Sequence, residues 1–206
     1  MKPLMIIQAR MGSTRLPGKV MMPIRGRVMI GYLLERMMRF DPIVAIPAED
    51  SGGLGIYLRQ YGRVFAYDGP VDDVAGRFAA VLAAWSCDAF IRICADSPLL
   101  DPALVDAAVA LYSGIYFLVS SPVGSVEICP TADFLKELPG MSRLEREHVL
   151  SRFERWYGSE AIYVGGGDAR LVVDTQEDFD RVAAVIGRMN RDHREYGWRE
   201  CLFLAS

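Results

Sequence analysis

The chain has 206 residues, about half of them apolar, which suits one α/β domain with a full hydrophobic core. Its 23 Lys and Arg against 26 Asp and Glu give a formal charge of −3, and this argues against nucleic-acid or anionic-membrane partners, since both attract positive proteins. The four cysteines form no CxxC pair, the apolar run at residues 4–7 is too short for a signal peptide, and no run approaches the roughly 18 residues of a membrane span. We therefore expect a cytoplasmic protein with reduced thiols.

The first half of the chain alternates apolar runs with amphipathic segments. A short apolar run predicts a buried parallel strand over residues 4–9, and a polar, glycine-rich loop follows over residues 10–19. Apolar residues at i, i+3, i+4, i+7 and i+8 predict a helix from Ile30. Beyond it, the pattern predicts a strand over 43–46, a short helix near 56–61, a strand over 63–67, a helix over 74–85 and a strand over 89–94.

The second half is less regular. Pro102 at a first-turn position opens a helix to residue 111. The elements expected after it are strands over 115–119 and 126–128, a helix over 144–157, strands over 161–164 and 171–173 separated by glycines 165–167, a helix over 177–189 and a weakly patterned tail. This alternation predicts a three-layer α/β/α fold with a mostly parallel sheet. Within one domain of residues 1–206, the stretch 119–167 breaks the alternation, so a small subdomain is expected there.

Ligands of open α/β sheets collect beyond the carboxyl ends of the strands, so the loop after the first strand is the first candidate site. It carries three cations, two glycines and two hydroxyls, a composition suited to a triphosphate cradle, although a solvated basic loop is the alternative. It is not a Walker A loop, because five residues separate Gly12 from Gly18 and Val20 replaces the metal-binding hydroxyl.

Two carboxylates at strand ends are candidate metal ligands. Asp96 follows the strand over 89–94 and precedes a proline turn, where it could hold Mg²⁺ on a nucleotide or merely cap the turn. Asp174 follows the last predicted strand and could share the metal, or Asp174 or Thr175 could cap the next helix. Cys94, on a buried strand, is better explained as a core residue than as a nucleophile.

Residues 7–20, IQARMGSTRLPGKV, resemble the opening signature of the spore coat polysaccharide type cytidylyltransferases, relatives of the CMP-Kdo and acylneuraminate (CMP-sialate) synthetases. Further agreement lies at residues 73–78, at IRICADSPL (91–99), at GSVE (124–127), at EREHV (145–149) and at VDTQEDF (173–179). Departures are Ala95 in place of a glycine, a different loop at residues 47–53 and a short acceptor region. The resemblance implies a Rossmann-like nucleotide-diphospho-sugar transferase fold, with CTP and a small sugar as substrates and Mg²⁺ as cofactor.

The resemblance also implies roles for individual residues. Gln8 and Ala9 would face cytosine and ribose. The phosphates would be bound within the loop by Arg10, Gly12, Ser13, Arg15 and Lys19, with Arg10 and Lys19 nearest the reacting phosphates and Arg77 near the nucleotide. Asp96 and Asp174 would bind Mg²⁺, Asp96 acting in catalysis with Arg10 and Lys19. Glu127, Glu147 and His148 would lie toward the sugar, although Glu147 and His148 could equally pack or pair on a helix face.

The implied reaction transfers CMP from CTP to an acidic or modified sugar and releases pyrophosphate, for the synthesis of a surface polysaccharide or glycoconjugate. The alternatives are a nucleotidyltransferase of other base or acceptor specificity, and a shortened, inactive nucleotide-binding relative. Because relatives often form dimers, residues 119–167 are where a homodimer contact would be sought.

Overall fold

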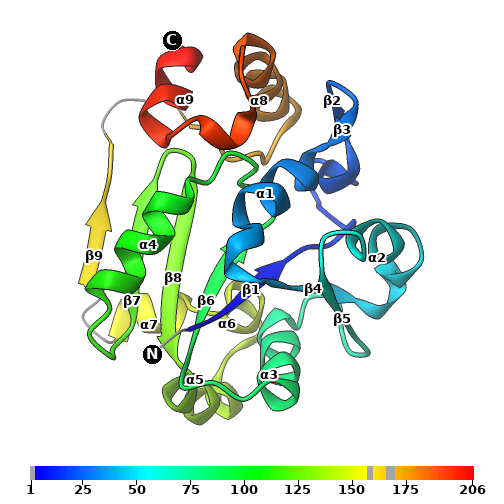
Figure 1. The fold of residues 1–206 in the computed structure, drawn as a ribbon. Helices are drawn as coiled ribbons and strands as arrows, with labels where there is room; N and C mark the ends of the chain where they lie inside the picture. Colours follow the sequence, from blue (N-terminus) through cyan, green and yellow to red (C-terminus); the bar gives the residue numbers. More distant parts are fainter. Residues whose placement is uncertain (1–2, 157–159, 166–169) are drawn as a thin grey trace.

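In the computed structural model, which describes residues 3–156, 160–165 and 170–206, a seven-stranded sheet has helices on both faces (Figure 1). The strand order is β5-β4-β1-β6-β8-β7-β9. Only β8 runs antiparallel to its neighbours among these strands, so the sheet is mixed and mostly parallel, as predicted. The strands are β1 Leu4–Gln8, β4 Ile43–Pro47, β5 Arg63–Tyr67, β6 Ala89–Cys94, β7 Phe117–Ser121, β8 Gly124–Pro130 and β9 Glu160–Tyr163.

The sheet divides the core in two because successive side chains on a strand point to opposite faces. On β1, Met5 and Ile7 pack on one face with α1 and α4, whereas Ile6 packs on the other with α3, α5 and α7. This is the predicted three-layer α/β/α arrangement. The helices are α1 Met29–Met37, α2 Gly53–Leu58, α3 Val74–Ala84, α4 Pro102–Leu111, α5 Thr131–Glu137, α6 Arg143–His148, α7 Ser151–Trp156, α8 Gln176–Arg188 and α9 Trp198–Ala205.

Two predicted elements are wrong in the described residues. The single helix expected over 144–157 is divided into α6 and α7 at Val149, whose φ of 53° no α-helix accommodates. The strand expected over 171–173 does not form, because the N–H groups of Leu171 and Val173 bond to two different segments, at the carbonyls of Pro122 and Asp96, instead of to one partner strand. Gly166, Gly167 and Tyr157, which also belonged to these predictions, lie outside the described residues.

Other differences are extensions, shifts or omissions. The strand expected over 126–128 is the longer β8, which forms a hairpin with β7, and β7 itself begins two residues later than expected, at Phe117. The pattern missed α5, α9 and a small hairpin of β2 Pro23–Ile24 and β3 Arg27–Val28. Within the described ranges, no helix has both the length and the apolar character needed to span a bilayer.

The strand order places a ligand site at one point of the sheet. From β1, the chain moves outward to β4 and β5, then crosses back to β6 on the other side of β1. The order therefore reverses between β1 and β6, and the crevice beyond their carboxyl ends is where open α/β sheets bind ligands.

The C-terminal segment is fixed to the domain by one buried arginine. Arg36 of α1 is 3% exposed and donates to the carbonyls of Leu100, at 2.9 Å, Tyr196, at 2.7 Å, and His193. A buried carbonyl that loses its donor costs free energy, so this single guanidinium stabilises the packing of the C-terminal residues on α1.

Replacing Arg36 by alanine is expected to lower the free energy of unfolding by about 3 kcal/mol or more, since three buried carbonyls lose their donor. The matched control is Arg39→Ala, which removes an exposed arginine that pairs with Asp106 and should cost less than about 1 kcal/mol. Urea unfolding of both variants measures this difference, and equal losses would contradict the role given to Arg36.

Candidate functional site

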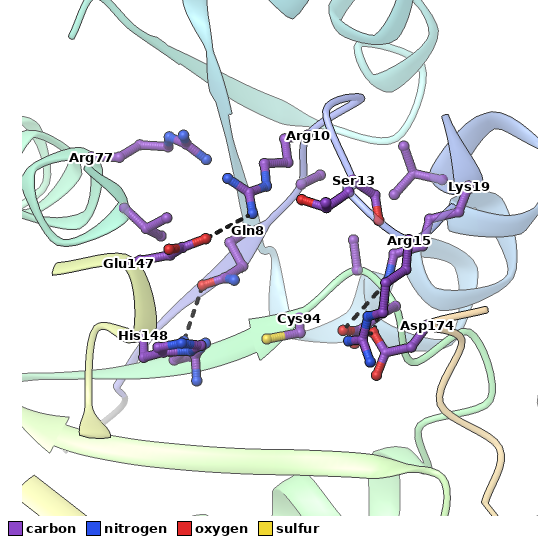
Figure 2. Close-up of a pocket in the computed structure, with 17 residues that line it drawn as sticks. Gln8, Arg10, Ser13, Arg15, Lys19, Arg77, Cys94, Glu147, His148 and Asp174 are labelled. Atoms are coloured by element: carbon purple, nitrogen blue, oxygen red, sulfur yellow. Dashed lines mark hydrogen bonds and ion pairs between the residues drawn. The ribbon is translucent and has the colours of Figure 1, made fainter. Parts of the chain in front are cut away.

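A cleft of about 320 Å³ opens beyond the adjacent ends of β1 and β6 (Figure 2). Most of the site residues predicted from the sequence line this one cleft: Gln8, Ala9, Arg10, Ser13, Arg15, Lys19, Arg77, Asp96, Glu147, His148 and Asp174. Gly12 belongs to the same loop without lining the cleft, and Glu127 lies in a neighbouring hollow. The structure therefore brings together residues from five separate segments of the chain.

The loop after β1 is folded on itself and anchored at Met11. The Met11 carbonyl accepts from the N–H groups of Ser13, at 2.9 Å, and Gly18, at 2.8 Å, while the Met11 N–H donates to Asp50 Oδ2 at 2.9 Å. Gly18 has a φ of 71°, a conformation that favours glycine, and it immediately precedes the short 3₁₀ turn Lys19–Met21. This turn directs Lys19 back into the cleft.

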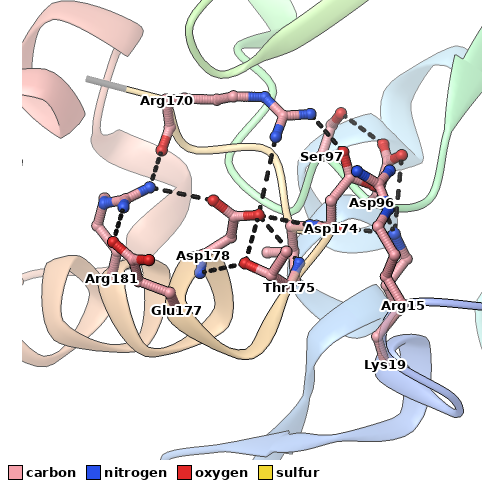
Figure 3. Close-up of polar contacts among 11 residues, drawn as sticks. Arg15, Lys19, Asp96, Ser97, Arg170, Asp174, Thr175, Glu177, Asp178 and Arg181 are labelled. Carbon is pink, nitrogen blue, oxygen red and sulfur yellow. Dashed lines mark hydrogen bonds and ion pairs between the residues drawn. The ribbon is translucent and has the colours of Figure 1, made fainter. Parts of the chain in front are cut away.

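Lys19 lies between the two predicted metal ligands. Its Nζ is 3.2 Å from Asp174 Oδ1 and 4.0 Å from Asp96 Oδ2, and it also donates to the Val173 carbonyl at 2.5 Å (Figure 3). Asp174 comes next to Asp96 because the Val173 N–H donates to the Asp96 carbonyl at 2.8 Å. A positive charge thus separates two carboxylates that would otherwise repel each other.

Capping of the helix α8, the alternative role considered for Asp174, is supplied by another residue. Thr175 caps α8, with Asp178 completing the capping box, and Asp101 caps α4. The Asp174 side chain is therefore free for cations, and it pairs with Arg15 at 2.9 Å and Arg170 as well as Lys19. Asp96 accepts a hydrogen bond from Ser97 at 3.0 Å.

The two carboxylates differ in how readily they ionise. Burial raises the pKa of Asp96 above its ordinary value, and the nearby charge of Asp174 raises it further. The charge of Lys19 and the hydrogen bond from Ser97 act in the opposite direction but do not outweigh burial. Burial also acts against ionisation of Asp174, but hydrogen bonds and charge from Arg170 and Lys19 outweigh it and lower the pKa of Asp174. The protein environment therefore favours ionisation of Asp174 and disfavours ionisation of Asp96.

Two further arginines face the cleft from the opposite side (Figure 2). Arg10 pairs with Glu147 of α6 at 3.2 Å. Arg77 of α3 is 1% exposed, donates to the Val71 carbonyl at 2.8 Å and makes no ion pair with the described residues, and its Nε has no partner among them. Burial, with the charge of Arg10, lowers the pKa of Arg77 to about 10, so it stays charged at neutral pH. A buried cation without a counterion favours an anionic ligand.

An unusual turn ends α6 beside the cleft. Val149 has φ 53° and ψ −64°, and the Leu150 N–H donates to the His148 carbonyl at 2.6 Å, which closes a strained γ-turn. Strained backbone of this kind persists only where the surrounding packing imposes it, and Val149 and Leu150 are fully buried. The turn leaves Glu147 and His148 at the cleft rim.

A second hollow, of about 550 Å³, adjoins the cleft and shares Arg92, Cys94 and Asp96 with it. Burial raises the pKa of the Cys94 thiol to about 12, so Cys94 stays protonated at neutral pH, as expected of a residue that is not a nucleophile. The core role expected from the sequence is wrong, because Cys94 is only partly buried and lines both cavities. The sequence analysis did not single out Arg92. The sequence did contain a signal for Arg92, because an arginine within an apolar strand such as β6 is rarely buried unless it has an ionic partner.

The family of the chain can now be stated. The chain matches the cytidylyltransferase family over residues 4–117, which include the loop after β1, Arg77 and Asp96. It belongs to this family. The resemblance noted from the sequence is thereby confirmed, and the match ends before Glu147, His148 and Asp174.

Individual relatives agree with this assignment. The chain is 28% identical to the spore coat polysaccharide biosynthesis protein SpsF of Bacillus subtilis (strain 168), over 88% of this chain and 85% of that protein. It is 33% identical to the 3-deoxy-manno-octulosonate cytidylyltransferase of Trichlorobacter lovleyi, over 53% of this chain and 44% of that enzyme.

Solved structures show the same fold. A cytidylyltransferase from Leptospira borgpetersenii superposes with a TM-score of 0.85 and 25% identity, covering 99% of this chain and 93% of that one. A CMP:2-keto-3-deoxy-manno-octonic acid synthetase complexed with CTP superposes with a TM-score of 0.65 and 16% identity, covering 91% of this chain and 99% of that one. The predicted nucleotide-diphospho-sugar transferase fold is confirmed.

Asp96→Asn is expected to raise the melting temperature of the free protein near pH 7, because it removes a partly buried charge whose ionisation is unfavourable. A group whose pKa is raised on folding stabilises only while it is protonated, so the gain should vanish as the pH falls toward the ordinary aspartate value of 3.8. Asp174→Asn is the matched control. The pKa of Asp174 is lowered, so this variant should melt below the wild type at neutral pH. Thermal melts from acid to neutral pH measure both effects, and a loss of stability in Asp96→Asn at neutral pH would contradict the assignment.

Proposed function

We propose that the protein transfers CMP from CTP to a sugar, acidic or modified, releases pyrophosphate, and serves the synthesis of a surface polysaccharide or glycoconjugate. The observation that carries the proposal is the convergence of Lys19, Asp96 and Asp174 in a cleft that also holds Arg10 and the buried Arg77. Family membership supplies the reaction class, and the name of the Bacillus subtilis relative suggests the polysaccharide. Because the reaction draws on CTP, we assign it to the cytoplasm.

Five cations line the cleft against three carboxylates, a balance that suits a triphosphate. In our proposal, Gln8 and Ala9 contact cytosine and ribose, the loop residues Gly12, Ser13 and Arg15 hold the outer phosphates, and Arg77 neutralises the nucleotide. Arg10 and Lys19, whose guanidinium and ammonium groups line the cleft, would stabilise the charge that builds on the leaving pyrophosphate.

The carboxylate pair suits Mg²⁺. The described residues contain no cluster of three or more His, Cys, Asp or Glu side chains that could form a metal cage. Mg²⁺ is usually bound by one or two carboxylates together with substrate phosphates, and Asp96 and Asp174 already lie on two sides of one cation, the Lys19 ammonium. When bound with the nucleotide, the metal would neutralise phosphate charge, held by Asp96 and Asp174, and Lys19 would then pair with phosphate instead.

The proposed reaction is an in-line displacement. The oxygen of a sugar hydroxyl forms a bond to the α-phosphorus, and the bond from that phosphorus to the α,β-bridging oxygen breaks. Pyrophosphate leaves with the electron pair, and the proton of the hydroxyl passes to water. The chain's contribution is to position the two substrates and to neutralise charge.

We assign the acceptor side to Glu127, Glu147 and His148, and to the segment 119–167, which contains the end of β7 and all of β8 and β9. The same segment is our candidate for a homodimer contact, because β9 pairs only with β7 among the described strands and leaves Ile162 and Tyr163 exposed at its edge. A monomeric mass in light scattering would contradict the dimer.

The base specificity can be tested by melting. CTP with MgCl₂ is expected to raise the melting temperature more than GTP, ATP or UTP, since a ligand at about 100 times its Kd stabilises the native state by about 2.7 kcal/mol. Equal shifts with all four nucleotides would favour the alternative of another base specificity. A CTP shift without pyrophosphate release over a broad panel of sugars would favour an inactive nucleotide-binding protein.

Lys19→Ala is expected to lower kcat on the order of 100-fold or more while changing the KM for CTP much less, if its contact strengthens as charge builds on the leaving group. Arg25→Ala serves as the control, because Arg25 is a basic residue of the nearby hairpin turn that does not line the cleft. Pyrophosphate release measures both constants, and a change in KM alone would assign Lys19 to ground-state binding.

A further inference from the structure

Two rows of side chains cross one face of the sheet from the cleft into the second hollow. In the strand register, Arg92 of β6 faces Glu127 of β8, and Glu127 faces Leu118 of β7. In the next row, Ser120 of β7 faces both Ser125 of β8 and Tyr163 of β9. All of these side chains line the hollow, and all but Leu118 carry polar groups, so a largely polar floor leads from Asp96 to the sheet edge.

The hollow has the opposite charge balance to the cleft. Its lining holds two cations, Arg92 and Arg170, against the three carboxylates of Asp96, Glu127 and Glu154. The remaining lining includes the hydroxyl groups of four serines and a tyrosine.

Both cations of the hollow already have partners. Arg92 bonds to Glu127 Oε2 and donates through Nε to Gln8 Oε1 at 3.0 Å, while Tyr116 donates to Glu127 Oε1 at 3.0 Å. The Arg92 and Glu127 side chains are only 13% and 12% exposed. A ligand carboxylate that took Arg92 would leave Glu127 buried without its counterion, which is costly. Arg170 is engaged by Asp174 and Asp178.

We propose that the acceptor bound in this hollow is a neutral or amino sugar rather than a carboxylate sugar. Hydroxyl or ammonium donors of such a sugar meet the carboxylates of Glu127 and Glu154 and the serine hydroxyls, and the exposed ring of Tyr163 offers an apolar face to the C–H side of a pyranose. Asp96 borders both the hollow and the cleft, so an acceptor hydroxyl in the hollow lies beside the nucleotide. The inference rests on the proposed transfer of CMP and replaces the acidic acceptor of that proposal with a neutral or amino sugar.

The test uses sugar trios that differ in one group. Glucose, glucosamine and glucuronate, with the matching trios of mannose and galactose, are titrated against the full chain loaded with α,β-methylene CTP and MgCl₂, and binding is followed by saturation-transfer NMR. We expect the neutral or amino member of at least one trio to bind at least tenfold more tightly than its uronate. Tighter or equal binding of the uronates, or no binding by any member, would overturn the inference.

Removing one carboxylate from the hollow tests whether its negative charge, and not its polarity alone, selects the sugar. Glu127→Gln removes the counterion of Arg92, so the ratio of uronate to neutral-sugar affinity is expected to rise at least tenfold. Glu195→Gln, which removes an equal charge from a residue that lines neither hollow, should leave the ratio unchanged. If Glu127→Gln fails to fold, Glu154→Gln, an exposed residue of α7, replaces it and should shift the ratio in the same direction. An unchanged ratio in the folded variant contradicts the inference.

The melting shift with CTP and MgCl₂ is measured first on every variant. Its absence in the wild type would count against CMP transfer itself, whereas a normal shift combined with a preference for uronates would overturn only the acceptor class. If Arg170→Gln abolishes such a preference for uronates, then Arg170 binds the carboxylate of an acidic acceptor, and the inference is wrong.

Discussion

Lys19, Asp96 and Asp174 form the interaction on which the rest of the site depends. The lysine belongs to the turn after the β1 loop, one carboxylate follows β6, and the other precedes α8, so three distant parts of the chain meet at one ammonium group. The two carboxylates are brought side by side by a backbone hydrogen bond from Val173 to the Asp96 carbonyl. Like charges at such close range need a cation between them, and in the free protein the lysine supplies it.

Two different electrostatic environments adjoin each other at a single ion pair, Arg92–Glu127. On the β1 side, an excess of cations lines a cleft suited to phosphate, and on the β8 side an excess of carboxylates and hydroxyls lines the hollow. Arg92 and Glu127 stand at the boundary and are held in register by the antiparallel pairing of β6 with β8. The reversal in strand order between β1 and β6 thus positions phosphate chemistry beside acceptor binding, because both use the same strand, β6.

Several residues near the cleft are in environments that are unfavourable for the folded protein. Ionisation of Asp96 costs free energy, Arg77 is buried and makes no ion pair with the described residues, and Val149 occupies a strained turn. The rest of the domain follows the usual rules, with apolar strands buried on both faces and capped helices. Such departures cluster at functional sites, where a group is fitted to a ligand and not to the free fold.

The sequence by itself determined the class of fold and the segments that carry the site. Apolar strands and amphipathic helices are local patterns, and the cationic glycine-rich loop with its carboxylates at strand ends could be found because parallel strands present such ends at one edge of a sheet. The tertiary structure alone decided that Lys19 lies between Asp96 and Asp174, that Thr175 and not Asp174 caps α8, and that the helix expected over 144–157 is broken at Val149. It also decided that Arg92 is held by Glu127. These facts depend on contacts between residues far apart in the chain, and local periodicity carries no information about which distant side chain will meet a given charge.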